Sequence, residues 1–285
     1  MDHFSIDCME LLQLPSFGGS SQPAETFYLR KMSATPAGVF DEVEQTGVTY
    51  LYSQLHGKTN SNHIASILDD TIEKKKKSGV DNRKLRVNWD NCSVNKCYLL
   101  ARFGIEQIRL GRYDSVEFDF MEAGHTKFSP DRMFGWLSGV LKVVDIFELS
   151  DAVSAVDRAR LLYARAHKKE CPYSLILVDS FDENGNSEFF YDWITYFGKS
   201  FKSFGFLTSL HRLKFFQSGL SNELKAKEHT SDKSWKAIKF YKPSKIINKN
   251  IYSLKKVPMK PAKVADIKKM TKFVPSGFLS YATED

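Results

Sequence analysis

Residues 85–122 read LRVNWDNCSVNKCYLLARFGIEQIRLGRYDSVEFDFME, and this stretch decides the fold. Apolar and polar residues alternate through Leu85–Trp89, which is typical of a strand, and Asp90 follows directly. The apolar residues that come next recur at helical spacing and predict a helix from about Ser93 to Arg109. In Val116–Glu122 apolar and acidic residues alternate, which indicates a strand with one face in water. A strand, a helix and a strand in succession predict an α/β fold.

The flanking sequence continues this alternation. Val48–Leu55 is rich in β-branched and aromatic residues and predicts a strand, and Ser61 or Asn62 is placed to cap a helix running to about Lys75. Ser129–Pro130 opens a helix with serine at the N-cap and proline at the first helical position. We also expect helices at Asp151–Ala166 and Phe189–Phe201 and a buried strand at Ser174–Asp179.

The composition is that of a globular protein. The chain has 285 residues, of which 42% are hydrophobic and 26% charged, so a disordered chain, a fibre and a disulfide scaffold are excluded. No apolar run is long enough to span a membrane, and four cysteines suit a reducing compartment. We expect an intracellular protein that makes no membrane contact, with the nucleus as one candidate location.

Positive charge is concentrated in the last third of the chain. Residues 199–285 carry 19 Lys and Arg against 6 Asp and Glu, whereas residues 1–198 carry 22 against 28. Such a split indicates a polyanionic partner for the basic region, and we expect DNA, although a solvated lysine-rich tail is the simpler alternative. The charge shift sets a boundary near residue 200. From Lys242 onward the lysines and prolines predict a tail without core elements.

Three aspartates stand where predicted elements begin or end. Asp7 follows the extended run His3–Ile6, Asp90 follows the strand Leu85–Trp89, and Asp131 lies in the first turn of a helix. Taken singly, these are an ordinary exposed acid, a turn residue and a residue that opposes the helix dipole. Brought together at the strand ends of an α/β sheet, three carboxylates require a cation, and oxygen ligands favour Mg²⁺ or Mn²⁺. Two such ions support phosphodiester cleavage.

Several blocks of the sequence resemble transposon-derived animal proteins with a transposase-type RNase H-like domain. The blocks lie in order over roughly residues 3–140, and AGHTKFSPDRMFG is the most specific. They are HFSID at His3–Asp7, LQLP at Leu12–Pro15, FYLRK at Phe27–Lys31, GVFDE at Gly38–Glu42, GKTNSNHIASIL at Gly57–Leu68, WDNCSVNK at Trp89–Lys96 and AGHTKFSPDRMFG at Ala123–Gly135.

The resemblance implies an RNase H-like mixed β-sheet flanked by helices. With the boundary that the charge shift sets, we expect this domain over residues 1–200 and a basic C-terminal extension over residues 201–285. It also implies that Asp7, Asp90 and Asp131 are the catalytic carboxylates and ligands of two Mg²⁺ or Mn²⁺ ions in a DDE-type site. The matching motif residues around that site are Asn91, Asn95, Lys96 and His125.

Two functions lead at this point, and a third option is a protein-interaction scaffold that needs neither metal nor nucleic acid. The family pattern after the second aspartate usually reads DNCSGQNKN, whereas this chain reads DNCSVNKC, which is one residue shorter. The chain is therefore expected to be either a metal-dependent nuclease or DNA strand transferase, or a catalytically decayed, nucleic-acid-binding protein that keeps the fold. A zinc site from Cys92, Cys97, His167 and Cys171 is a weaker alternative, because structural zinc usually has tighter cysteine spacing.

Overall fold

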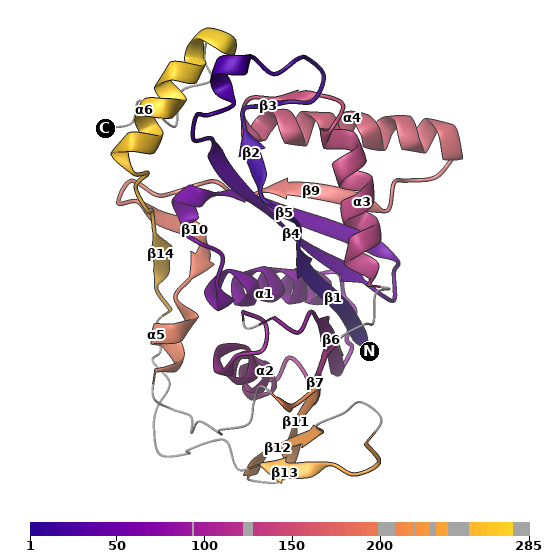
Figure 1. Ribbon diagram of the computed structural model, residues 1–285. Helices are drawn as coiled ribbons and strands as arrows, with labels where there is room; N and C mark the ends of the chain where they lie inside the picture. The colour runs from indigo at the N-terminus through magenta and orange to yellow at the C-terminus, as the bar shows by residue number, and fades with distance from the viewer. Residues whose placement is uncertain are drawn as a thin grey trace.

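The computed structural model describes residues 1–92, 94–121, 128–198, 209–218, 221–227, 232–238 and 251–275. Within these residues, ten strands form one central sheet (Figure 1). Nine lie in the spatial order β13 (Lys236–Ile238), β12 (Ser221–Lys227), β11 (Arg212–Ser218), β7 (Ser115–Phe120), β6 (Lys84–Trp89), β1 (Asp2–Cys8), β4 (Met32–Asp41), β5 (Thr46–Ser53) and β9 (Tyr173–Leu177). The tenth strand, β2 (Leu12–Leu14), pairs with β4.

The sheet is mixed, as the sequence predicts for an α/β fold. β1 runs parallel to β6, and β6 runs parallel to β7, whereas β1 is antiparallel to β4 and β4 to β5. The two parallel crossovers are the helices α1 (Ser61–Lys77) and α2 (Tyr98–Arg109). Both strands of the deciding stretch are confirmed, since the bounds of β6 and β7 agree with the predicted ranges to within two residues.

Helices cover the two faces of the sheet through separate cores. On one face α1 and α2 pack against alternate residues of β1, β6 and β7, among them Ile6, Trp89 and Phe118. On the other face α3 (Ser129–Leu141), α4 (Leu149–His167) and α6 (Pro261–Met270) pack over β2, β4, β5 and β9. Figure 1 shows α1 and α2 below the sheet and α3, α4 and α6 above it. On this second face the strands from β1 to β12 carry mostly polar side chains.

Short elements complete the described chain. They are β3 (Ser16–Phe17) paired with β8 (Asp145–Ile146), β10 (Asn186–Tyr191) paired with β14 (Ser253–Lys255), the single turns η1 (Ala24–Thr26), η2 (Gln54–His56) and η4 (Thr271–Phe273), and the short helix α5 (Trp193–Phe197). No helix in the described parts of the chain is long and apolar enough to cross a membrane.

Two predicted helices differ from the structure. Of the predicted helix Phe189–Phe201, only α5 is helical among the described residues, because β10 continues to Tyr191. Residues 199–201 lie outside the described part of the chain. The crowded aromatics there fit a strand as well as a helix, so the spacing of apolar residues cannot separate the two. Helix α2 begins at Tyr98 rather than near residue 93, because Asn95 and Lys96 form turn hydrogen bonds with the carbonyl of Cys92.

The expectation of a tail without core elements from Lys242 onward is wrong. Strand β14 pairs with β10, and α6 buries Ile267 and Met270 in the second core. Lys268 and Lys269 of this helix are exposed on its outer side, so they hide a short apolar stripe. The predicted boundary near residue 200 stays a prediction, although β11, β12 and β13 extend the same central sheet.

Candidate functional site

Two of the three predicted aspartates follow neighbouring parallel strands. The register of β1 and β6 pairs Ile6 with Trp89, so Asp7 and Asp90 come next on each strand. Residues that are directly paired in a sheet point to the same face. Asp7 pairs with Gly38 on its other side, and Gly38 is in contact range of α3. The two aspartates therefore lie at the carboxyl ends of β1 and β6, on the side of the sheet that α3 occupies.

This face of the sheet is polar over the five strands β1, β6, β7, β11 and β12, whereas α3 covers the neighbouring strands β4 and β5. Its side chains are joined by hydrogen bonds and ion pairs across the strands. Asn88 contacts His3 at 2.9 Å and donates to Ser5 at 3.1 Å, and Arg86 forms an ion pair with Asp119 at 2.6 Å. We call the following residues the polar sheet face: His3, Ser5, Arg86, Asn88, Glu117, Asp119, Arg212, Lys214, Lys225 and Lys227.

The Asp7 carboxyl group is half-buried and electrostatically coupled to both other aspartates. Burial is the largest cause that raises its pKa, to about 6 from the ordinary 3.8, and the charges of Asp90 and Asp131 raise it further. The N–H of Cys8 donates to Asp7 Oδ1 at 2.8 Å and lowers the pKa in part. The structure thus brings Asp90 and Asp131 close enough to Asp7 for their charges to act on its carboxyl group.

Asp131 reaches this site because α3 is tied to β1. The Glu42 carboxylate, just after β4, accepts hydrogen bonds from the hydroxyls of Ser5 at 2.5 Å and Ser129 at 2.9 Å. Ser5 lies two residues before Asp7 on β1, and Ser129 lies two residues before Asp131 on α3. Glu42 therefore links the elements that carry these two aspartates.

Sequence reasoning missed this link. It interpreted Ser129 as a helix cap, but the Ser129 side chain caps no backbone group, and α3 begins at Ser129 with Phe128 at the N-cap. The signal was present in the GVFDE block, which ends at Glu42, and in the serine of the AGHTKFSPDRMFG block. A carboxylate that accepts hydrogen bonds from two serines far apart in the sequence produces no periodic pattern in that sequence.

The segment after Asp90 forms a compact turn. Asp90 is exposed and its Oδ1 accepts from the N–H of Asn91 at 2.7 Å. The buried Lys96 donates from Nζ to Asn91 Oδ1 at 2.9 Å, and Asn95 Nδ2 donates to the carbonyl of Asp90 at 3.4 Å. These predicted supporting residues therefore hold the turn that carries Asp90. The fourth, His125, lies outside the described residues.

The donor set is suited to a hard cation, but the carboxylates do not yet form a cage. In Asp7 and Asp90 one oxygen accepts from a backbone N–H, and the second has no hydrogen-bond partner in the described residues. The raised pKa of Asp7 reflects burial first and then the charges of Asp90 and Asp131, which a bound cation would offset. Among the described residues, however, no group of three His, Cys, Asp or Glu side chains is arranged to hold a metal ion.

The four residues of the zinc alternative, all of which are described, likewise form no group arranged to hold a metal ion. Cys92 and Cys97 lie in the turn before α2, whereas His167 ends α4 and Cys171 precedes β9. All four cysteines are free thiols.

Comparison with known proteins places the chain in one family. A search of curated proteins finds no match to the chain. The family described as "Domain of unknown function (DUF7869)" matches residues 28–232, which is well over half of the sequence. The matched range contains Asp90 and Asp131, as well as the strands β4–β7 and the helix α3, while Asp7 precedes it. The chain therefore belongs to the DUF7869 family.

Proposed function

We propose that this chain is a transposase-derived, RNase H-like domain that acts on DNA phosphodiesters through Asp7, Asp90 and Asp131. The observation that carries the proposal is the electrostatic coupling of the three carboxyl groups at the ends of β1, β6 and the start of α3. Separate roles in a turn, a strand end and a helix start would not require these three residues to lie within range of one another's charges. A mixed sheet with helices on both faces is also the architecture that an RNase H-like domain requires.

Each aspartate has a distinct role in the proposed site. Asp7 and Asp90 offer one oxygen each from the ends of adjacent strands, and Asp131 offers a carboxylate from the first turn of α3. A bound pair of Mg²⁺ or Mn²⁺ ions would supply Lewis-acid stabilisation of the attacking and leaving oxygens. Glu42 positions the site by fixing Ser129 against Ser5, and Lys96 supports the turn of Asp90 through Asn91.

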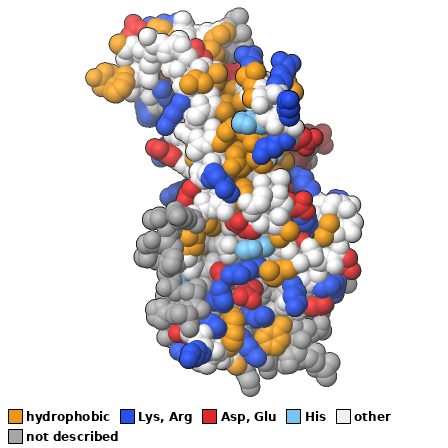
Figure 2. Space-filling model, turned by 90° about the vertical axis from the view of Figure 1, so that its right-hand side faces the viewer, with side chains coloured by type: hydrophobic (Ala, Val, Ile, Leu, Met, Phe, Trp, Pro, Cys, Tyr) orange, Lys and Arg blue, Asp and Glu red, His pale blue; other side chains and the backbone are white. Residues whose placement is uncertain are grey.

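A cationic surface for the DNA backbone would lie on the same polar sheet face. The register pairs Arg212 with Asp119 at the carboxyl end of β7, which is the end where Asp7 and Asp90 lie. On β12, Lys227 pairs with Arg212 of β11, and the Lys227 ammonium group lies 4.8 Å from the ring centre of Trp235. In Figure 2 Lys and Arg side chains gather with acidic and hydrophobic ones on the lower half of the molecule. Cations interleaved with an aromatic ring are typical of nucleic-acid contacts.

The metal site is tested with the substitution Asp90→Asn. Asparagine keeps the oxygen that accepts from Asn91, so the turn and the fold should persist, while one anionic ligand is lost. We expect calorimetric titration with Mn²⁺ to show binding to the wild type and at least about tenfold weaker binding to the variant. Nicking of supercoiled DNA in Mn²⁺ should fall in parallel.

The control is Asp157→Asn on the exposed side of α4, which should change neither the Mn²⁺ affinity nor the rate of DNA nicking. Equal Mn²⁺ affinity in the wild type and Asp90→Asn would contradict the proposed site.

A second candidate function is a catalytically decayed protein that binds nucleic acid and keeps the fold. The observation in its favour is that the described carboxylates form no metal cage, together with the shortened sequence after Asp90. The same experiment separates the two functions. DNA binding with no nicking in either protein would favour the decayed form.

A further inference from the structure

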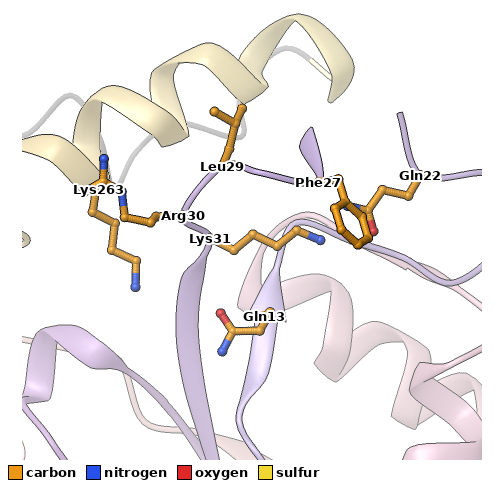
Figure 3. A pocket seen from close by; sticks show the side chains of 7 residues that line it. All are labelled: Gln13, Gln22, Phe27, Leu29, Arg30, Lys31 and Lys263. Carbon is orange, nitrogen blue, oxygen red and sulfur yellow. The ribbon is translucent and has the colours of Figure 1, made fainter. Parts of the chain in front are cut away.

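A cavity far along the sheet from the three aspartates is lined by positive charge. It has a volume of about 480 Å³ and lies between β2, the segment that leads into β4, and α6 (Figure 3). The side chains that matter to its chemistry are Gln13, Gln22, Phe27, Arg30, Lys31 and Lys263. Four of these six residues lie in or beside the FYLRK block or β2, which the proposed function does not use.

Two of the cations in the cavity have no acidic partner among the described residues. Lys31 and Lys263 are half-buried, and no carboxylate of the described residues lies within ion-pair distance of either ammonium group. Burial lowers the pKa of both lysines, and no acidic neighbour offsets that effect. Arg30 differs, because it is paired with Asp266 at 2.6 Å.

The partners of the two lysines are neutral. Lys263 Nζ donates to Gln54 Oε1 and, at 3.4 Å, to the hydroxyl of Ser33, while the Lys31 ammonium lies 5.7 Å from the ring centre of Phe17. A half-buried charge without a counter-charge destabilises the fold, and a bound anion would remove that cost. The arrangement therefore favours an anionic ligand.

The placement of the lysines indicates the size of that ligand. Figure 3 shows Lys263 entering from α6 on one side, whereas Lys31 extends toward Phe27 and Gln22 on the other. A single phosphate group is better suited to contact one cation than to bridge two cations that are spread along a cavity. The Phe27 ring is 72% exposed at the rim, where it could cover an attached planar group.

We propose that this cavity binds the diphosphate group of a small phosphorylated molecule. Lys31 and Lys263 bind the two phosphates, and the amides of Gln13 and Gln22 donate hydrogen bonds to their oxygens or to the group they carry. The site does not depend on the aspartates or on a metal ion, so it goes beyond the proposed function and can be tested apart from it.

The test is calorimetric titration of the full chain in metal-free buffer with inorganic phosphate, pyrophosphate and ADP. We expect pyrophosphate to bind more tightly than phosphate. Lys31→Gln and Lys263→Gln should each weaken pyrophosphate binding about tenfold, because each removes one charge-assisted contact. Lys31→Arg keeps the positive charge and should retain most of the wild-type affinity. Lys169→Gln, an exposed lysine beyond the end of α4, is the matched control and should bind as the wild type does.

The comparison of ADP with pyrophosphate identifies the source of the diphosphate. Tighter binding of ADP that is lost in Phe27→Ala would identify a nucleotide, whereas equal binding would identify the diphosphate alone. Thermal unfolding of each variant shows that the fold is intact. The proposal is wrong if the wild type binds neither compound, or if the double variant Lys31→Gln/Lys263→Gln binds pyrophosphate as well as the wild type does.

Discussion

The Asp7 carboxyl group becomes costly to ionise at the end of β1. Its pKa of about 6 arises first from burial and then from the charges of Asp90 and Asp131. An unfolded aspartate titrates near 3.8, so between the two values the folded protein holds the proton more tightly than the unfolded chain does. The contribution of this group to stability is therefore complete below pH 3.8 and is lost as the pH rises through 6.

Asp7→Asn removes this dependence on pH. At pH 8 we expect the variant to have a free energy of unfolding higher by roughly 1 to 2 kcal/mol, after allowance for the partial exposure of the carboxyl group. Near pH 4 the wild-type group is protonated, and the difference should vanish. Urea denaturation of both proteins across this pH range measures the effect, and Asp157→Asn is the exposed control. A difference that does not change with pH would contradict the burial of Asp7.

The same residue shows how far sequence reasoning reaches. The position of Asp7 after an extended run is visible in the sequence, and so is the strand that places Asp90. The coupling of the two depends on a parallel register between β1 and β6, which lie about 80 residues apart in the chain. A register between distant strands leaves no trace in local spacing. For the same reason Glu42, which joins Ser5 to Ser129, could not be found from the sequence.

At the scale of elements, the seating of α3 on the sheet depends on two glycines. A Cβ at Gly38 would lie 2.3 Å from Met133 Cε and 2.7 Å from Phe134 Cε1, and a Cβ at Gly47 would lie 2.4 Å from Met133 Sδ. These distances are too short for any contact, so α3 approaches the sheet as it does only because both positions lack a side chain. Gly38 pairs with Asp7, so this contact also sets where Asp131 lies relative to Asp7.

We expect Gly38→Ala to lower the free energy of unfolding by about 1–3 kcal/mol, because Phe134 cannot move aside as Met133 can. It should also lower Mn²⁺ affinity if the proposed site is correct. The matched control is Gly139→Ala in the same helix, where an added Cβ meets nothing within 4 Å and should stabilise α3 by about 0.5–1 kcal/mol. Urea denaturation measures both. Loss of stability in Gly139→Ala with none in Gly38→Ala would show that the helix is not seated in this way.

Elements with a strong period were predictable, and crowded ones were not. The strands β6 and β7 and the helices α1 and α4 follow from alternation and helical spacing, and their boundaries agree with the sequence to within a few residues. β10 was predicted as a helix because its aromatic residues fit either period. Its strand form depends on β14, which lies more than 60 residues later in the chain.

At the scale of the whole molecule, the described part of the basic region is built into the fold. β11, β12 and β13 extend the central sheet, and α6 closes the second core with Ile267 and Met270. The charge count shows the excess of lysines but not where they lie in the structure. Net charge carries information about binding partners and solubility, but not about the fold. Removing residues 242–285 would therefore disturb the fold together with the charge, and it is not a clean test of DNA binding.

Point substitutions on β12 give the clean test. Lys225 lies 4.9 Å from the ring centre of Phe216, and Lys227 lies 4.8 Å from that of Trp235, so both ammonium groups stand beside aromatic rings on the polar sheet face. Each phosphate that a lysine neutralises releases condensed counterions, and the slope of log affinity against log salt changes by about 0.9 per duplex contact. Lys225→Gln/Lys227→Gln should therefore weaken duplex binding and reduce that slope by up to about 2.

In the proposed complex the lysines would contact backbone phosphates rather than base edges, so the loss should be similar for duplexes of different sequence. Fluorescence anisotropy over a range of salt concentrations measures both quantities. Lys168→Gln/Lys169→Gln, at the far end of α4, removes the same charge from a surface away from the sheet face and should leave the slope unchanged. If the two double variants lose affinity equally, binding follows net charge alone. The polar sheet face would then have no specific role in DNA binding, and β11 and β12 would serve only to extend the sheet.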